Sequence, residues 1–342
     1  MKRHHAGSYQ PSARDCMRLD NVANYRFAVL TKVTAVLFLT CLWTLPLRAQ
    51  LGAGFSTIDP PQSVFTLAFA VNDHHKIVGT YYDANGLGHG FLRSEDGRFV
   101  TIDHPRAQTV NGFGTEARGI NSAGQIVGDY CAAPPCDGVS VIKGYLLTGD
   151  GDDKDDFDKP HFKTLKTPGH INSYLQHINA EGDIVGCEHD TDTMETMHGI
   201  VWDDGKVTRF PVPFSMNNGI NERKEIVGFY VDPSTGRRHG YLLRKGVATL
   251  IDFPGAVATI AWDINNRGQV VGVYHKEDFV IHGFLWHKGK FTSVDIPGAS
   301  LTVVFGINAV GDIVGLYEDA TTGHGFLLRA EDTESGGGGG DK

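Results

Sequence analysis

Short apolar segments rich in Ile, Val, Phe and Tyr recur along the chain, and turn residues such as Gly, Asn, Asp and Pro separate them. One segment, 259–265, ends on Ile-Asn and is followed after a turn by the β-branched pair Val270-Val271 and by Gly272. Segments of this kind are typical of strands joined by tight turns. No stretch after residue 49 has the pattern of a long amphipathic helix, so we expect an all-β protein.

This Asn, the β-branched pair and the Gly form the first motif of a repeat. In every copy the Gly follows the Asn by seven residues, and a constant spacing within one chain indicates a structural repeat. The copies begin at Asn72, Asn121, Asn179, Asn221, Asn265 and Asn308.

Two further motifs follow the first in each repeat. The second is His-Gly-aromatic, and the third is Phe-Thr-x-Val-Asp with its variants, ending at Asp103, Asp252 and Asp295. The second motif begins at His89, His239, His282 and His324, whereas the second and third copies have Lys143-Gly144-Tyr145 and His198-Gly199-Ile200. Each repeat therefore supplies four strands: strand a ends at the Asn, strand b follows its turn, strand c carries the second motif and strand d the third.

The spacing of the repeats predicts the fold. Consecutive asparagines lie 42 to 58 residues apart, and periods of about 40 to 50 residues with four short strands belong to β-propeller blades. The last copy lacks a strand d, and the segment 55–60 supplies one ahead of the first strand a. Pairing the two would remove exposed sheet edges. The sequence predicts a six-bladed β-propeller over 50–332, its ring closed by the N-terminal strand completing the last blade.

The combined motifs resemble the HAF-type extracellular repeat family of bacteria. The stretches 119–130, 282–285 and 291–299 carry the resemblance most closely, and it covers 55–329. The second and third repeats depart from it by longer insertions and, at Lys143, by a missing histidine. The resemblance implies an exported repeat protein and supplies no catalytic motif.

The two ends of the chain differ from the repeats. Lys32 precedes an apolar run at 33–45 and Ala49 closes the segment, so 1–49 is expected to be a secretory signal peptide. An uncleaved membrane anchor is the alternative, and Met17 is an alternative start. The Gly-rich tail, 333–342, is expected to be disordered. We therefore expect a secreted or periplasmic protein.

Charge narrows the choice of partners. Without residues 1–49 the chain keeps 24 Lys and Arg against 38 Asp and Glu, a net charge of −14. Such a surface repels nucleic acid and anionic lipid, so neither is expected as a partner. We expect a monomer, with no membrane span once the signal is cleaved. Cys131 and Cys136 could form a bridge in an oxidising compartment, and Cys187 would then remain.

The histidines of the second motif are expected to be structural. Each heads strand c of its own blade, so they should stand around a ring rather than converge on a metal. We expect them to tie the backbone of each blade together, and the repeated asparagines to cap turns. Function is then expected where the repeat loses its symmetry.

One break in symmetry lies two residues before the Asn of strand a. Glycine or alanine takes this position in four copies, and His177 and Asp263 take it in the third and fifth. A His and an Asp near a central channel could bind a cation or transfer a proton. Filling space or bonding locally is the alternative.

The loops between strands b and c vary as well. Together with His170 they are expected to form an acidic, histidine-bearing rim on one face, with His189, Asp190 and His275 as candidate binding residues. A merely solvated acidic rim is the alternative.

An acidic insertion in the second repeat resembles a calcium loop. Asp150, Asp152, Asp153 and Asp155 are its candidate ligands, but Lys154 takes the fifth place and no Glu stands at the twelfth. A polar hairpin extension is the first interpretation, calcium the second, and no other cofactor is expected.

Two functions remain open. The first is an exported, non-catalytic binding or scaffold propeller that recognises a protein, a glycan or another surface ligand. The alternative is a propeller lyase or glycoside hydrolase that uses channel-facing acids and histidine. Geometry separates them, because the enzyme requires His177, Asp263 and a rim carboxylate around one cavity.

Overall fold

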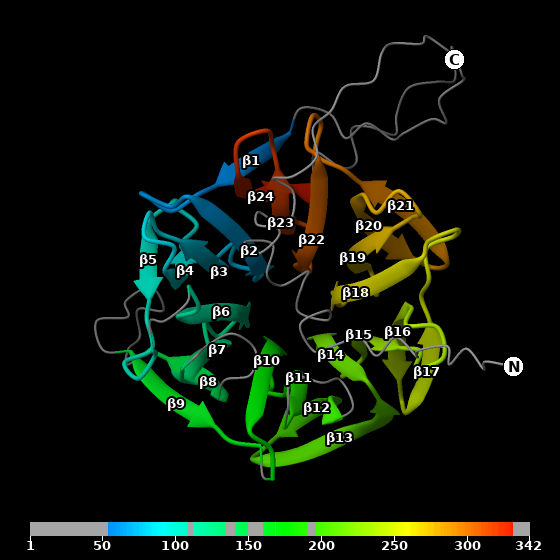
Figure 1. Ribbon diagram of the computed structural model, residues 1–342, viewed down its shortest axis with the longest axis horizontal. Coiled ribbons are helices and arrows are strands. Elements are labelled where there is room, and N and C mark those ends of the chain that lie inside the picture. Colours follow the sequence, from blue (N-terminus) through cyan, green and yellow to red (C-terminus); the bar gives the residue numbers. More distant parts are fainter. Residues whose placement is uncertain are drawn as a thin grey trace, which may run out of the picture.

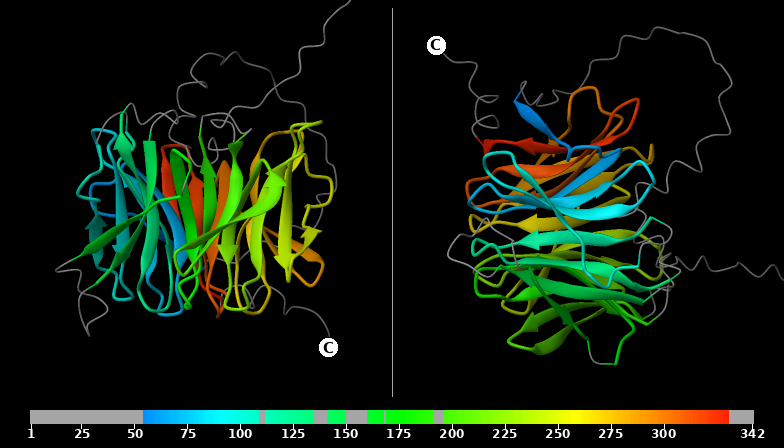
Figure 2. Two further views of the ribbon diagram at one scale, coloured as in Figure 1. Left: turned by 90° about the horizontal axis from the view of Figure 1, so that it is seen from below. Right: turned by 90° about the vertical axis from the view of Figure 1, so that its left-hand side faces the viewer.

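The computed structural model describes residues 54–108, 112–134, 141–149, 160–167, 169–190 and 196–330. Six four-stranded antiparallel sheets stand around a central axis (Figure 1), and their strands run between the two faces of a short cylinder (Figure 2). The predicted six-bladed β-propeller is confirmed. The predicted signal peptide and the Gly-rich tail lie outside the described residues. Within those residues, no helix has the length and hydrophobicity to cross a membrane.

Each blade runs from strand a at the axis to strand d at the rim. The a strands are β2 (Phe65–Val71), β6 (Thr115–Ile120), β10 (Asn172–Ile178), β14 (Ser215–Ile220), β18 (Ala258–Ile264) and β22 (Leu301–Ile307). The b strands are β3 (Ile77–Tyr82), β7 (Ile126–Ala133), β11 (Ile184–His189), β15 (Ile226–Val231), β19 (Val270–His275) and β23 (Ile313–Glu318). The c strands are β4 (Gly88–Arg93), β8 (Val141–Thr148), β12 (His198–Asp203), β16 (Arg238–Arg244), β20 (Ile281–His287) and β24 (Gly323–Leu328). The d strands are β5 (Phe99–Ile102), β9 (His161–Leu165), β13 (Lys206–Pro213), β17 (Val247–Leu250), β21 (Lys290–Val294) and β1 (Phe55–Ile58).

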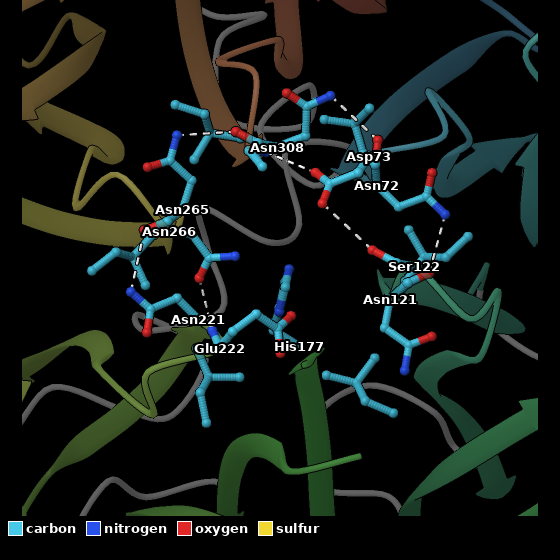
Figure 3. A pocket seen from close by; sticks show the side chains of 17 residues that line it. Asn72, Asp73, Asn121, Ser122, His177, Asn221, Glu222, Asn265, Asn266 and Asn308 are labelled. Atoms are coloured by element: carbon cyan, nitrogen blue, oxygen red, sulfur yellow. Dashed lines mark hydrogen bonds between the residues drawn. The ribbon is translucent and has the colours of Figure 1, made fainter. Parts of the chain in front are cut away.

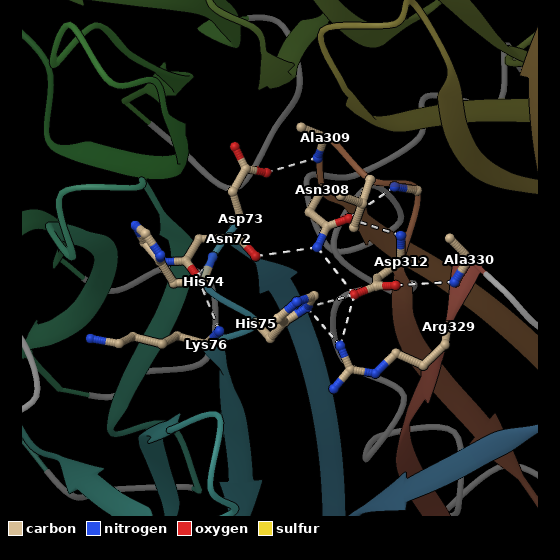
Figure 4. A network of polar contacts seen from close by, with 12 residues as sticks. Asn72, Asp73, His74, His75, Lys76, Asn308, Ala309, Asp312, Arg329 and Ala330 are labelled. Atoms are coloured by element: carbon tan, nitrogen blue, oxygen red, sulfur yellow. Dashed lines mark hydrogen bonds and ion pairs between the residues drawn. The ribbon is translucent and has the colours of Figure 1, made fainter.

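The first strand closes the ring, as predicted. β1 pairs with β24 of the last blade in an antiparallel register. Figure 4 shows a second set of closing contacts, in which Asp312 of blade six lies 2.8 Å from His75 Nδ1 of blade one. The guanidinium of Arg329 donates to the same carboxylate at 3.0 Å. Both ends of the repeat array are therefore held by side chains as well as by a strand.

The repeated asparagines link the blades to one another. Each Oδ1 accepts backbone N–H groups of its own turn, as Asn265 Oδ1 does from Arg267 and Gln269 at 3.0 and 3.1 Å. Each Nδ2 donates to the backbone oxygen of the next asparagine, at 2.9 to 3.5 Å, and the six bonds form a closed circuit. The predicted turn cap is confirmed, and the link between blades explains why no other residue takes the position.

The repeated histidines are structural, although their partner differs from the one expected. In four blades the Nδ1 of this His lies 2.7 to 2.9 Å from the Asp that closely follows strand d, rather than on backbone. The same rings stack on a tyrosine of strand b with centroids 5.1 to 5.4 Å apart. The pairs are His89–Asp103, His239–Asp252, His282–Asp295 and His324–Asp59, and the tyrosines are Tyr81, Tyr230, Tyr274 and Tyr317.

Every strand a carries a β-bulge three residues before its Asn, which the sequence did not predict. A bulge adds a residue and re-aims its side chain. The six bulged residues, here named the bulge ring, are Phe69, Arg118, Gln176, Asn218, Trp262 and Phe305. All are buried, and members from neighbouring blades touch, so the ring packs around the axis.

Candidate functional site

His177 and Asp263 meet at the axis. His177 Nε2 on β10 lies 3.5 Å from Asp263 Oδ1 on β18, although blade four stands between their blades. The two positions follow directly on bulged residues, which explains why their side chains reach one another across blade four. The structure therefore brings together the pair that the break in symmetry suggested.

Glycine in the neighbouring blades makes room for this layer. A Cβ on Gly219 would lie 2.7 Å from Asp263 Cα, and one on Gly119 would lie 2.8 Å from His177 Cα. Gly306 stands in the same relation to Ala70, at 2.9 Å. Blades two, four and six thus need glycine where blades three, five and one carry a side chain. The layer has threefold alternation, and the sequence comparison of six equal copies missed it.

The Asp263 carboxylate is buried and well bonded. Its Oδ1 accepts the backbone N–H of Ile264 at 2.8 Å and its Oδ2 accepts that of Ile307 at 2.9 Å. Burial raises the pKa of Asp263, and the nearby His177 and these two N–H groups act in the opposite direction. The carboxylate is therefore a fixed partner for His177 that clamps blade five to blade six.

A small polar cavity opens beside this pair on the face where the a–b turns lie, here named the asparagine face. Its volume is about 50 Å³, and five of the six repeat asparagines, all but Asn179, line it. Asp73 and Glu222 stand at its edge, and both accept backbone N–H groups of neighbouring blades. Figure 3 shows His177 pointing toward the middle of this cavity. A cavity of this size holds a few water-sized groups and excludes a whole sugar ring.

A second polar group lies in blade three on the opposite face, here named the loop face. His170 lies 3.4 Å from Glu188 Oε1 through Nε2 and 3.0 Å from Asp190 Oδ1 through Nδ1. Arg209 Nε of β13 also contacts Glu188 Oε1. We name these four residues the blade-three cluster. Glu188 is fully buried, whereas Arg209 is 46% exposed, so the cluster reaches from the interior to the surface.

The blade-three cluster replaces a packing unit of the other blades. The residue two after the Gly of strand b is a tyrosine in the other five copies and Glu188 in the third. In blade one this tyrosine, Tyr81, bonds Thr101 of strand d at 3.1 Å. The residue of β13 at the register of Thr101 is Arg209. An ion pair therefore stands where the repeat has a tyrosine and a threonine.

The remaining predicted residues are dispersed. His189 is buried and stacks on Tyr174 with centroids 5.3 Å apart, so it does not face a ligand. His275 lies on blade five and stacks on Phe279. The predicted rim is thus not one group: His170 and Asp190 lie together, the side chain of the adjacent His189 is buried against Tyr174, and His275 lies on another blade.

The two polar groups stand at opposite ends of β10. Residue 172 pairs with His189 at the loop-face end, and Ile178 pairs with Ile184 at the asparagine-face end. Among the described residues, no rim carboxylate therefore shares the cavity of His177 and Asp263, and the geometry required for the enzyme alternative is not met there.

The predicted calcium ligands Asp150, Asp152, Asp153 and Asp155 lie outside the described residues. Across the part of the chain that is described, no three His, Cys, Asp or Glu side chains gather in a way that could hold a metal ion. Cys131 is disulfide-bonded, and its predicted partner Cys136 also lies outside the described residues.

Sequence reasoning missed a buried ionic group in blade two. Arg118 of the bulge ring contacts the Glu116 carboxylate and lies 3.8 Å from Asp129. Its guanidinium stands 4.4 Å from the centre of the Phe69 ring. The signal available was a pair of charged residues inside a strand a that is otherwise apolar or neutral.

Comparison with known proteins supports the architecture alone. A mutant of AofleA from Arthrobotrys oligospora is 13% identical over 83% of this chain and 90% of its own, with a TM-score of 0.50. A mutant of the Aleuria aurantia lectin in complex with Fucα1-6GlcNAc is 12% identical over 78% and 93%, with a TM-score of 0.48. The β-propeller domain of the Trilobed protease from Pyrococcus furiosus is 11% identical over 82% and 99%, with a TM-score of 0.44. No family model and no curated protein matches the chain.

Proposed function

We propose that this chain is an exported, non-catalytic binding propeller that takes a glycan or a similar polyhydroxylated ligand at the blade-three cluster on the loop face. The observation that carries the proposal is that a buried carboxylate oxygen of Glu188 lacks a hydrogen-bond donor among the described residues. Its side chain is fully buried, and its Oε2 has no hydrogen-bond partner among the described residues. A buried acceptor left in this way costs free energy until a donor reaches it.

The surroundings of Glu188 favour a hydroxylated ligand. Arg209 and Asp190 are 46% and 36% exposed, so one offers N–H donors and the other an acceptor at the surface. The side chain of Ile171 next to His170 is 48% exposed and offers an apolar contact. Hydroxyl groups that both donate and accept, on a ring with an apolar face, match this combination.

The proposal is tested by a glycan array followed by calorimetry on the purified protein. The array includes Fucα1-6GlcNAc, the ligand of one of the similar solved structures. Glu188→Gln keeps the shape but removes the carboxylate, so we expect at least a tenfold loss of affinity for any glycan that binds. Asp278→Asn is the matched control, because it also removes one negative charge but lies in a loop of blade five. It should bind as the wild type does.

Two results would reject this site. One is that no glycan binds, and the other is that Glu188→Gln binds as tightly as the wild type while keeping the same melting temperature. A glycan that binds equally to both proteins would move the site elsewhere on the propeller.

Export and family membership belong to the same proposal. They rest on the segment 1–49 and on the HAF-type motifs of the sequence. Expression of the full chain in a bacterium, with fractionation and N-terminal sequencing of the exported protein, tests them. A new N-terminus at Gln50 supports cleavage, and an intact N-terminus in the membrane fraction supports the anchor.

A further inference from the structure

The bulge ring has an aromatic half and a polar half. Phe305 touches Phe69 and Trp262, with ring centroids 5.0 and 5.2 Å apart, so blades five, six and one fill their side of the axis with aromatic rings. Arg118, Gln176 and Asn218 of blades two, three and four occupy the other side. Trp262 borders both halves, because its blade follows that of Asn218.

On blades three, four and five, three buried polar atoms of the bulge ring are left without a hydrogen bond from any described residue. Gln176 Nε2, Asn218 Oδ1 and Trp262 Nε1 have no hydrogen-bond partner among the described residues, and the three residues are only 2% to 6% exposed. Asn218 Nδ2 donates to the backbone oxygen of Ala261 at 2.9 Å, which fixes the amide. Two donors and one acceptor thus stand on consecutive blades and do not bond one another. Such groups cost free energy unless a further molecule satisfies them.

The next layer connects these atoms to the opening on the asparagine face. His177 follows Gln176 and Asp263 follows Trp262, and His177 Nδ1 also lacks a partner in the described part of the chain. His177 lines the cavity of about 50 Å³. His177 therefore stands between this cavity and Gln176 in the polar half of the bulge ring.

We infer that the polar half of the bulge ring is a binding site for a single hydroxyl-bearing guest. A hydroxyl donates to Asn218 Oδ1 and accepts from the N–H groups of Trp262 and Gln176, which is the pattern that these three atoms leave open. Water and the terminal hydroxyl of a small polyol share this chemistry, and the neighbouring cavity of about 50 Å³, which His177 lines, admits only molecules of this size. The site is independent of the blade-three cluster, which lies at the other end of β10.

The indole N–H of Trp262 reports on this site directly. The chain has four tryptophans, so protein labelled with ¹⁵N-tryptophan gives few indole signals, and Trp262→Phe identifies the one that matters. We expect a cross peak between this N–H and a long-lived water if water is the guest. If a polyol is the guest, ethylene glycol or glycerol should shift the signal to saturation, and Asn218→Leu should weaken that binding at least tenfold. Ser122→Ala, at the edge of the same cavity, is the control and should leave it unchanged.

The inference is overturned if the Trp262 signal of the wild-type protein shows neither a water cross peak nor a saturable shift. It is also overturned if Asn218→Leu leaves the polyol shift as it was. The first measurement needs no variant in the site, so it decides the question even if the substitutions impair folding. Loss of glycan binding in Glu188→Gln would not affect this result.

Discussion

His324 Nδ1 on β24 lies 2.7 Å from Asp59 Oδ2, although 265 residues separate the two along the chain. The other three pairs of this kind join strands c and d of one repeat over 13 or 14 residues. The closing blade therefore uses the same bond as the others, with its Asp supplied by the opposite end of the array. A pair that packs two strands of one repeat elsewhere thus joins the two ends of the ring here, and we name His324 and Asp59 the clasp.

Because Asp59 joins the two ends of the chain and Asp103 does not, replacing Asp59 by alanine should loosen its blade more than the same change at Asp103 does. Asp59→Ala and Asp103→Ala each remove a bond to a histidine, at about 1 kcal/mol. Asp59→Ala should in addition loosen β1, which only this blade receives from the other end of the chain. Hydrogen exchange should rise along Gly323–Leu328 in Asp59→Ala more than along Gly88–Arg93 in Asp103→Ala. Equal protection in the two variants would contradict a special role for the clasp.

Replacing Lys224 by glycine is expected to stabilise the protein by an amount that depends on the salt concentration. The third residue after the repeat Asn has a positive φ in every blade, and it is glycine in four of them but Lys224, at 56°, in blade four. A left-handed lysine costs roughly 1 kcal/mol, and here its Nζ lies 3.0 Å from Asp183 of blade three. His75 in blade one reaches Asp312 of blade six in the same way. Each non-glycine residue thus faces an aspartate of the preceding blade.

Because Lys224 is half exposed, its ion pair is weak and screened by salt. We expect Lys224→Gly to be nearly neutral at low salt and to stabilise the protein by up to about 1 kcal/mol in 1 M NaCl. Urea denaturation at the two salt concentrations measures the effect. The control Lys245→Gly relieves a similar φ of 48°, and we expect its gain to vary less with salt. A loss of stability for Lys224→Gly in high salt would contradict the explanation.

The repeated part of the fold could be predicted because each repeated residue makes the same bond in its own blade. The spacing of Asn72 and its copies is fixed by a turn and by one bond to the next blade, so it appears in the sequence as a constant. The bulge could not be predicted, because the bulged residues share no side-chain type and range from Phe69 to Arg118. What they share is a backbone irregularity, which leaves no compositional mark.

The candidate sites were predictable in part for a similar reason. His177 and Asp263 stood out because they interrupt a column of small residues, and the structure brings them together. Arg209 did not stand out, because it lies on strand d, where the repeat is irregular in the third copy. Its pairing with Glu188 depends on the register of three strands, and a sequence pattern does not report that register.

A side chain at Gly219 is expected to clash with the layer that holds His177 and Asp263. A Cβ there would meet Asp263 Cα at 2.7 Å and the backbone oxygen of Trp262 at 2.9 Å, and neither atom can move without shifting β18. We expect Gly219→Ala to cost about 1 to 3 kcal/mol, as overpacking does. Ala70→Gly, at the same level in a blade that carries a side chain, introduces no clash and should cost only about 0.5 to 1 kcal/mol. Thermal unfolding of both variants measures the difference, and equal melting temperatures would contradict the threefold alternation.

The buried His104 is expected to make the stability of the fold depend on pH in the acid range. It follows Asp103, is buried, and stacks on Tyr130 with ring centroids 3.6 Å apart. Burial lowers the pKa of His104 from 6.5 to about 4, with a further contribution from the charge of Arg106. Between these two values the unfolded chain binds a proton that the folded chain does not bind, so stability falls as the pH falls through this window. The loss attributable to this residue reaches up to about 3 kcal/mol at the acid end.

The connection between blades four and five offers the matched substitution, because Phe253 takes the equivalent position and stacks on Tyr274 at the same 3.6 Å. His104→Phe should keep the stacking and lose the bond from the Arg106 N–H to His104 Nδ1, at about 1 kcal/mol independent of pH. Relative to the wild type, the variant should therefore gain stability as the pH falls from 6.5 to 4, and Phe253→His should lose it. Urea midpoints at pH 7.5, 6, 5 and 4.5 give both curves. Parallel curves for wild type and His104→Phe would show that His104 titrates alike in the folded and unfolded chain.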